Sequence, residues 1–180
     1  YPVFDALSHA HGCQSQQVIA LFARIDAAFA ALLDRLAGTG ADVVVSADHG
    51  FIDSPARRIV HLDRHRDAAS MLAVPLFGER RAALCEVRCG AEQDFAAFVG
   101  EILAGKAVLA PSPALVKAGF LGPGRAHRQL RERIGSHVLL MEPGWTICDR
   151  MPGEHSHAMP GVHGGLSPQE MWVPLIHARC

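Results

Sequence analysis

The chain has 180 residues, of which 49% are hydrophobic and 19% are charged. This length and composition are typical of one globular domain that is large enough to have a core. The formal net charge of −1 gives no electrostatic reason to expect binding to a nucleic acid polymer. We expect no membrane span either, because no apolar stretch approaches the roughly 20 residues that a membrane helix needs.

The first two predicted elements are a strand and a long helix. Tyr1 to Phe4 are predicted to be a strand that leads into Asp5. Residues 14–37 carry apolar side chains at helical spacing, and two glycines, Gly38 and Gly40, end the helix. The apolar face of this helix consists of Val18, Leu21, Phe22, Ile25, Phe29, Leu32, Leu33 and Leu36.

A short apolar run from Val43 to Val45 follows the helix. A run of this kind predicts a buried parallel strand. Asp48 and His49 stand at its carboxyl end, where open α/β sheets place their ligands. The alternation of strands and helices predicts an α/β fold with a central sheet covered by helices on both faces.

Residues 55–160 are predicted to form a cap-like insertion. Three of its segments read as strands, and the last two form a β-hairpin over residues 72–88. A Pro/Gly-rich loop over residues 151–165 ends this part of the chain and contains His163. The three strands are residues 58–62, residues 72–77 and a strand that runs through Val87. The other predicted elements are a strand at 138–141 and helices at 91–103 and 126–134.

Three short motifs carry side chains that bind divalent metals. Asp5 and His9 are four residues apart, Asp48 and His49 are adjacent, and His163 is followed by two glycines. Carboxylate oxygens and imidazole nitrogens are the usual ligands of zinc. Five such groups cannot all bind one tetrahedral ion that keeps an open position, so we predict two ions. In the second motif, the glycine of Asp-His-Gly is expected to let the backbone turn sharply beside the ion.

The order of these motifs resembles that of the alkaline phosphatase superfamily, and most closely its type I phosphodiesterase/nucleotide pyrophosphatase family. Residues 164–176, Gly-Gly-Leu-Ser-Pro-Gln-Glu-Met-Trp-Val-Pro-Leu-Ile, resemble the closing segment of that family, and residues 78–88 resemble its bacterial members. The resemblance implies an alkaline-phosphatase-like three-layer α/β/α sandwich. It covers only the later part of the family's domain. We therefore expect residues 1–180 to be the C-terminal part of one catalytic domain, whose N-terminal portion is the missing partner.

The same resemblance implies how the metal ligands divide. Asp5, His9 and His163 are expected to bind one ion, and Asp48 and His49 to belong to the other. An upstream aspartate and the nucleophile would complete the second site. Zinc suits the nitrogen-rich ligands best, with manganese or iron as alternatives.

The expected function is metal-dependent hydrolysis of a phosphodiester or pyrophosphate bond in a small nucleotide-type substrate. The nucleophile is expected upstream, so the isolated chain should be inactive. Ser46, Thr39 and Thr146 lack a visible activating base. The alternatives are a phosphonate or phosphomonoester hydrolase, a phosphomutase or a sulfatase of the same superfamily, and a non-catalytic module that metal stabilises.

The remaining histidines, arginines and cysteines are expected to have structural roles. His155 and His157 are interpreted as loop histidines. The arginines at 57–58, at 80–81 and between 125 and 133 are expected on a solvated face. Five cysteines without a zinc spacing favour a reducing compartment such as the cytoplasm.

Overall fold

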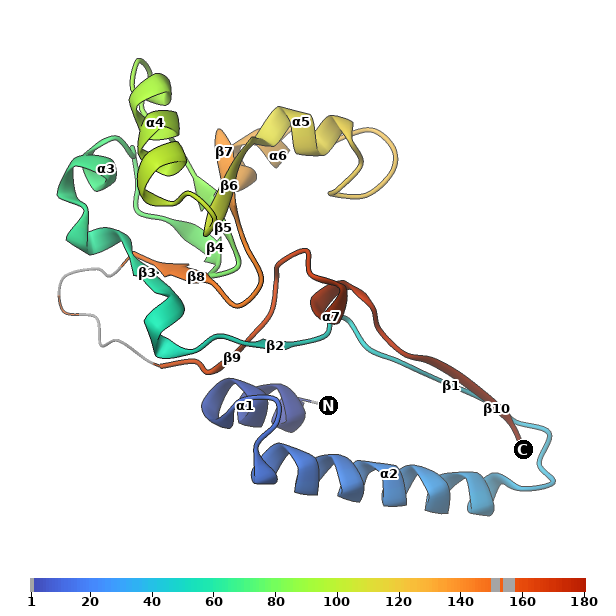
Figure 1. Ribbon diagram of the computed structural model, residues 1–180. Helices are drawn as coiled ribbons and strands as arrows, with labels where there is room; N and C mark the ends of the chain where they lie inside the picture. Colours follow the sequence, from blue (N-terminus) through green and yellow to red (C-terminus); the bar gives the residue numbers. More distant parts are fainter. Residues whose placement is uncertain (1, 150–152, 154–157) are drawn as a thin grey trace. The chain divides into compact units, whose positions relative to one another are not determined.

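The computed structural model describes residues 2–149, 153 and 158–180 and has mixed α/β architecture (Figure 1). It divides into two compact units. The first unit comprises the residues up to Ser54 together with Ala158–His163 and Ser167–Cys180. The second unit comprises Pro55–His157 and Gly164–Leu166.

The elements of the first unit are α1 (Pro2–His11), α2 (Gln16–Leu36), β1 (Asp42–Ser46), β2 (Ile52–Asp53), β9 (Gly161–Val162), α7 (Pro168–Met171) and β10 (Leu175–Arg179). The helical elements of the second unit are η1 (Ala56–Arg58), η2 (Leu62–Arg64), α3 (Arg66–Ser70), α4 (Glu92–Ile102), α5 (Ser112–Lys117) and α6 (Leu130–Ile134). Its strands are β3 (Ile59–His61), β4 (Phe77–Glu79), β5 (Ala82–Cys85), β6 (Ala107–Pro111), β7 (His137–Met141) and β8 (Thr146–Cys148).

The helix α1 stands where the sequence predicted a strand before Asp5, so that prediction is wrong. Four residues are too few to separate helix from strand by spacing alone. Pro2 suits a first helical turn, where a missing N–H costs nothing, and the charge of Asp5 suits the same end. The helix ends at His11 and is followed by Gly12, whose φ is +87° and whose N–H donates to the carbonyl of Ser8 at 2.9 Å. As a result, Asp5 and His9 lie one helical turn apart on the same face.

The helix α2 confirms the long helix predicted for residues 14–37. The hydroxyl of Ser15 caps it by accepting a hydrogen bond from the N–H of Val18 at 3.3 Å. By length and composition α2 could also cross a membrane, so the expectation that no stretch approaches this length is wrong. One such helix is weak evidence of a membrane span, because the core helices of soluble proteins and signal sequences pass the same test. Arg24 and Asp26 also lie near its middle.

The strand β1 confirms the predicted strand, but the prediction that it is buried and parallel is wrong. It pairs antiparallel with β10, with Val44 opposite His177, and its side chains alternate between exposed and half-buried. Among the described residues, neither strand pairs with a third one. The strand β10 was not predicted from the sequence.

A two-residue ladder joins two segments that are far apart in the sequence. Strand β2 pairs antiparallel with β9, with Ile52 opposite Val162 and Asp53 opposite Gly161. Strand β9 lies within the predicted loop 151–165, so the described part of that segment is not all loop. Figure 1 shows β9 beside β2, with α1 next to them. This ladder connects the segment that follows Asp-His-Gly to the segment that precedes His163.

The second unit contains a four-stranded antiparallel sheet of order β4-β5-β7-β6. The hairpin predicted over residues 72–88 is confirmed as β4 and β5, although near residue 72 only one bridge, from Leu72 to Val87, extends it. Strands β3 and β8 pair in parallel. The predicted helix at 91–103 is confirmed as α4, whereas the helix predicted at 126–134 is shortened to α6. The core contains Phe95 and Val99 from α4, Leu103 directly after it, and Leu139 and Met141 from β7.

Arg81 contradicts the expectation that residues 80–81 lie on a solvated face. Its side chain is fully buried. The Nη1 group donates hydrogen bonds to the carbonyls of Met141, Glu142 and Trp145 at 3.0, 2.7 and 2.6 Å. Arg81 therefore stabilises the turn between β7 and β8, because it donates hydrogen bonds to backbone carbonyls that would otherwise be unpaired in the interior.

Candidate metal centre

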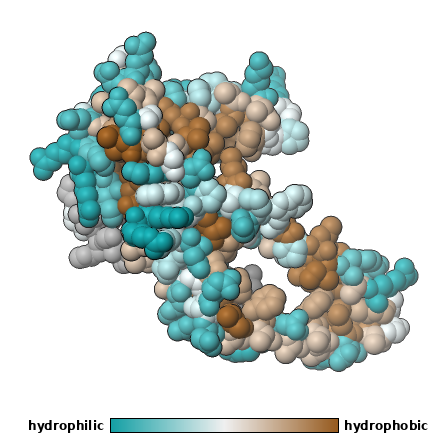
Figure 2. Space-filling view, viewed as in Figure 1, coloured by the Kyte–Doolittle hydropathy of each residue, from teal (hydrophilic) through white to brown (hydrophobic). Residues whose placement is uncertain are grey.

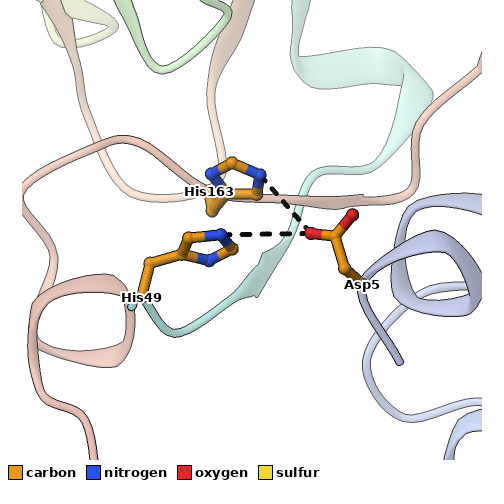
Figure 3. A group of neighbouring side chains, drawn as sticks. All are labelled: Asp5, His49 and His163. Carbon is orange, nitrogen blue, oxygen red and sulfur yellow. Dashed lines mark ion pairs between the residues drawn. The ribbon is translucent and has the colours of Figure 1, made fainter. Parts of the chain in front are cut away.

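The carboxylate of Asp5 is surrounded by three imidazole nitrogens within the first unit. Its Oδ1 atom lies 3.5 Å from Nε2 of His9, 3.7 Å from Nε2 of His163 and 4.0 Å from Nε2 of His49. Figure 3 shows His49 and His163 both directing a ring nitrogen at this oxygen, which projects from α1. The sequence motifs that carry Asp5, His49 and His163 thus converge at one place.

The β2–β9 ladder explains why His49 and His163 meet. Ile52 lies opposite Val162, so the same register carried one step further places Phe51 opposite His163. His49 precedes Phe51 by two residues, and its ring stacks on that of His163. The two ring centroids are 3.7 Å apart and the planes differ by 17°.

Backbone carbonyls fix the tautomers of two of these histidines. Nδ1 of His9 lies 2.9 Å from the carbonyl oxygen of Gly161, and Nδ1 of His49 lies 3.1 Å from that of Gly50. A carbonyl oxygen only accepts hydrogen bonds, so each Nδ1 carries the hydrogen. The lone pair of each Nε2 is then free to bind a metal ion, which is the usual arrangement of metal-binding histidines.

The spacing of these donor atoms suits a metal ion. Asp5, His49 and His163 each offer a ligand atom, and these atoms all lie within 4.8 Å of one another. Ligands at about 2 Å from a tetrahedral zinc ion are about 3.3 Å apart, so small side-chain rotations would close the observed separations around an ion. The donor set of one carboxylate and several imidazoles is also the one that zinc prefers.

Asp48 lies at the edge of this group. Its side chain is 89% exposed, and its Oδ1 is 3.8 Å from Nε2 of His49. A hydrogen bond with its own backbone holds the pKa of Asp48 below its ordinary value. The structure thus brings Asp5, His9, His49 and His163 together, with Asp48 next to His49. The division of the five residues between two ions stays a prediction.

Phe51 is a component of the site that the sequence analysis missed. Its ring lies 5.2 Å from that of His9, 5.3 Å from that of His49 and 5.1 Å from that of His163, centroid to centroid. One aromatic ring therefore packs against all three imidazoles and restricts their rotation. Its position directly after Asp-His-Gly was the only signal in the sequence.

The glycine of Asp-His-Gly has a different role from the one predicted. Gly50 does not have a positive φ, so no unusual backbone turn requires it. A Cβ atom at this position would collide with the carbonyl oxygen of Gln169, and the N–H of Gly50 donates to the carbonyl of Glu170 at 2.8 Å. Glycine is required because the backbone of α7 passes directly beside it.

The segment that holds Gly50 is itself stabilised by a local cap. The carboxylate of Glu170 accepts hydrogen bonds from the hydroxyl and the N–H of Ser167, at 2.6 and 3.4 Å. Both side chains are buried. The Leu-Ser-Pro-Gln-Glu segment therefore forms a rigid support for the loop that carries Asp48 and His49.

The hydroxyl groups considered as nucleophiles have other surroundings. Ser46 is exposed at the end of β1. Thr39 donates to the carbonyl of Leu36 at 2.6 Å, and Thr146 is buried in β8 of the second unit. His155 and His157 lie outside the described residues.

Comparisons with known proteins show the family and the fold of the chain. A model of the type I phosphodiesterase/nucleotide pyrophosphatase family matches residues 1–166. No curated protein matches the sequence. The solved structure of human ectonucleotide pyrophosphatase/phosphodiesterase 5 matches with a TM-score of 0.71 and 16% identity over 96% of this chain. The phosphonoacetate hydrolase of Sinorhizobium meliloti 1021 matches with a TM-score of 0.67 and 20% identity, also over 96% of this chain.

The matched structures are longer than this chain. The alignment covers 44% of the human protein and 43% of the bacterial one. At these identities the likeness shows the fold alone, which is the predicted alkaline-phosphatase-like α/β fold, present here as a partial domain.

Proposed function

The chain belongs to the type I phosphodiesterase/nucleotide pyrophosphatase family, and from this premise we propose that it forms part of a metal-dependent hydrolase of phosphodiester or pyrophosphate bonds. The observation that carries the proposal is the arrangement around Asp5. Three Nε2 atoms lie within 4.0 Å of its Oδ1. Backbone carbonyls hold two of these rings in the tautomer that leaves Nε2 free for a metal ion.

Asp5, His9 and His163 hold one ion in this proposal, and Asp48 and His49 contribute to a second. Zinc fits this donor set, with manganese or iron as alternatives. Two bound ions supply positive charge that stabilises the phosphoryl oxygens as the ester bond breaks. The exposed side chain of Asp48 leaves room for further ligands, which we assign, together with the nucleophile, to a segment outside this chain.

We assign the substrate to small nucleotide-type phosphoesters. A second candidate is a phosphonate, because the Sinorhizobium meliloti protein, whose structure holds phosphonoacetate, matches about as well as the mammalian proteins do. The metal ligands contact only the phosphoryl group. Selection between the two substrate classes therefore depends on residues that contact the remainder of the substrate.

We further propose that residues 55–160 form a cap-like insertion that selects the leaving group. The second unit supports this idea because it has a core of its own, built around Phe95 and Leu139. Exchanging this segment between related full-length enzymes should change substrate preference and leave metal content unchanged. Preference that follows the N-terminal half instead would contradict the assignment.

The decisive experiment compares metal content with turnover in the complete protein. We expect hydrolysis of bis(p-nitrophenyl) phosphate to require zinc or manganese and to fall at least 100-fold in His163→Ala. His177→Ala is the matched control, because His177 pairs with Asp42 on the exposed β1–β10 ribbon. A complete protein that binds metal without hydrolysing phosphodiesters or phosphonoacetate would instead be a non-catalytic, metal-stabilised module.

A further inference from the structure

The second unit has a hollow (the α3–α4 hollow) that contains none of the five predicted metal ligands. It is lined by residues 63–68, which run from η2 into α3, and by Phe98 and Ile102 of α4. All of these residues belong to the second unit. The volume of the hollow is about 630 Å³, within the range of roughly 300–1,000 Å³ that is usual for small-molecule sites. It is therefore large enough to hold one small organic molecule.

Part of the lining of the α3–α4 hollow is apolar and aromatic. Ala68 is buried, and Phe98 is half-buried and packs against the core of the second unit. The ring of His65 meets that of Phe98 edge-on, with 5.4 Å between the centroids. Ile102 adds aliphatic surface and is 43% exposed. Side chains of these kinds suit a flat aromatic ring, which stacks on them whatever hydrogen-bonding groups it carries.

Contacts within the second unit hold the walls of the α3–α4 hollow in place. The N–H of His65 donates to the carbonyl of Leu62 at 2.8 Å, and the N–H of Ala69 donates to the carbonyl of His65 at 3.0 Å. The side chain of Leu62 is fully buried in the core. In α4 the rings of Phe95 and Phe98 stack, with 6.2 Å between their centroids. Because the walls are preformed, little chain entropy is lost when a ligand binds.

Two exposed arginines, Arg64 and Arg66, also line the α3–α4 hollow. Neither guanidinium group forms an ion pair or a hydrogen bond with the described residues, although the carboxylates of Asp63 and Asp67 line the same hollow. Oδ1 of Asp63 instead lies 3.9 Å from Nδ1 of His61. The planar guanidinium group matches the oxygens of a phosphate and binds them in pairs. The two positive charges are therefore free to bind an anionic group of a ligand.

The lining of the α3–α4 hollow thus combines three kinds of group. Hydrophilic and hydrophobic surface adjoin where α3 and α4 lie (Figure 2). The exposed carboxylate of Asp67 accepts hydrogen bonds, for which the hydroxyl groups of a sugar are suitable donors. A ligand that matches the whole lining has an aromatic ring, hydroxyl groups and a phosphate, and a nucleoside monophosphate has all three. A free phosphate ion would leave the aromatic surface uncovered, and a nucleoside would leave both guanidinium groups unpaired.

We propose that the α3–α4 hollow binds a nucleoside monophosphate. The base stacks on Phe98, Arg64 and Arg66 hold the phosphate, and Asp67 accepts hydrogen bonds from the sugar. The hollow belongs to the second unit, whereas the candidate metal ligands belong to the first. Binding therefore needs no metal ion and involves no hydrolysis, and the inference does not rest on the proposed function.

The test is a titration of the 180-residue chain with adenosine 5′-monophosphate, followed by amide NMR spectroscopy. The chain is first dialysed against EDTA, so that no metal ion contributes to binding. We expect saturable shifts of the amides of residues 64–68 and of those around Phe98. Adenosine and inorganic phosphate each carry only part of the ligand, and both should bind at least tenfold more weakly. Metal content and turnover are not measured, so failure here is distinguishable from failure of the proposed function.

A pair of arginine substitutions gives an independent readout. Arg64→Glu should weaken the binding of adenosine 5′-monophosphate at least tenfold, because it places a negative charge beside the phosphate. Arg125→Glu is the matched control, since Arg125 is exposed between α5 and α6 and does not line the hollow. It makes the same change of charge and should leave the affinity unchanged.

Phe98→Ala tests the aromatic part of the lining. It should weaken the binding of adenosine 5′-monophosphate and of adenosine by similar factors, because both present the same ring to Phe98. The binding of inorganic phosphate should stay the same. Phe98 packs against the core, whereas Arg64 is exposed, so the arginine test still decides the question if Phe98→Ala does not fold.

Three results would overturn the inference. The first is a titration with adenosine 5′-monophosphate in which the amides of residues 64–68 do not shift. The second is an equal affinity for adenosine 5′-monophosphate and for either adenosine or inorganic phosphate, since one half of the ligand would then contribute nothing. The third is an equal loss of affinity in Arg64→Glu and Arg125→Glu, which would indicate an effect of net charge alone.

Discussion

The imidazole rings of His49 and His163 stack face to face, with 3.7 Å between their centroids, although they come from segments far apart in the sequence. The stack aligns both Nε2 atoms with the same carboxylate oxygen of Asp5 (Figure 3). It depends on the short β2–β9 ladder, which sets the register of the two segments. We therefore expect metal binding and the folding of the first unit to be coupled through this stack.

We expect the isolated chain to retain at most about one tightly bound ion after dialysis. Asp5, His9 and His163 supply three protein ligands, the number that a catalytic zinc site uses, whereas Asp48 and His49 supply only two. Substituting His9→Ala or His163→Ala should reduce the metal content measured by elemental analysis. His177→Ala should not, because its ring pairs with Asp42 away from the site.

His49→Ala discriminates between two groupings of the ligands. The predicted division assigns His49 to the weaker second site, so the retained ion should persist in this variant. In the structure, however, the Nε2 atom of His49 lies 4.0 Å from Oδ1 of Asp5, and the donor atoms of Asp5, His49 and His163 all lie within 4.8 Å of one another, so small side-chain rotations would also let these three bind the same ion. Two tightly held ions, or one ion lost only in His49→Ala, would contradict the division.

Phe51→Ala should lower metal affinity about tenfold while keeping every ligand. The ring of Phe51 packs against His9, His49 and His163, so its loss lets the imidazoles rotate away from the geometry that binds an ion. Competition against a chromophoric chelator measures the change. Phe98→Ala is a suitable comparison, because Phe98 packs against His65 in the second unit. Equal losses of affinity in both variants would show that the effect is not local.

Gly50→Ala should destabilise the loop that carries Asp48 and His49 by about 1–3 kcal/mol. The added methyl group has no room, because it would meet the carbonyl oxygen of Gln169. Gly100→Ala is the matched control: nothing lies within 4 Å of the added group, and Gly100 is inside α4. There alanine should stabilise the helix by about 0.5–1 kcal/mol. Thermal unfolding of the two variants should therefore change in opposite directions.

The isolated chain should not hydrolyse bis(p-nitrophenyl) phosphate at a measurable rate, even with zinc or manganese added. None of the hydroxyl groups considered is placed as a nucleophile: Ser46 is exposed on β1, and Thr146 is buried in the second unit. Robust turnover that disappears in His163→Ala would show that this chain contains a nucleophile after all.

The sequence predicted the elements that have a long periodic pattern. The helix α2 and the helix α4 have several turns of regularly spaced apolar residues, and their predicted positions are confirmed. The segment before Asp5 offered only four residues, for which helix and strand patterns do not differ, and it is a helix. Strand β9, with two residues, has no pattern at all, yet it sets the position of His163.

The site itself was predicted only as far as residue types and their order allow. Asp5, His49 and His163 follow from ligand chemistry, but their convergence depends on the β2–β9 register, which is a non-local property. The residues next to Gly50 in the sequence do not show why glycine is required there, because the carbonyl oxygen that leaves no room for a side chain belongs to Gln169. Arg81 was misplaced for the same reason, since the carbonyls that satisfy it come from distant residues.

Cys13 should resist alkylation at pH 8 even though its side chain is partly accessible. Burial, followed by its hydrogen bond to Asp53 and the charge of that carboxylate, raises the pKa of the thiol to about 12. Since the thiolate is the reactive form, about one thiol in ten thousand is reactive at pH 8.

Asp53→Asn removes the charge and keeps an oxygen that can accept the hydrogen bond from the N–H of Cys13. The pKa of Cys13 should therefore fall, and its reaction with iodoacetamide, followed by mass spectrometry, should become at least tenfold faster. Burial also raises the pKa of Cys85 in the second unit to about 12, so Cys85 should stay slow in both proteins and serve as the internal control. Equal acceleration at Cys13 and Cys85 would indicate general unfolding, and an unchanged rate at Cys13 would mean that Asp53 does not control it.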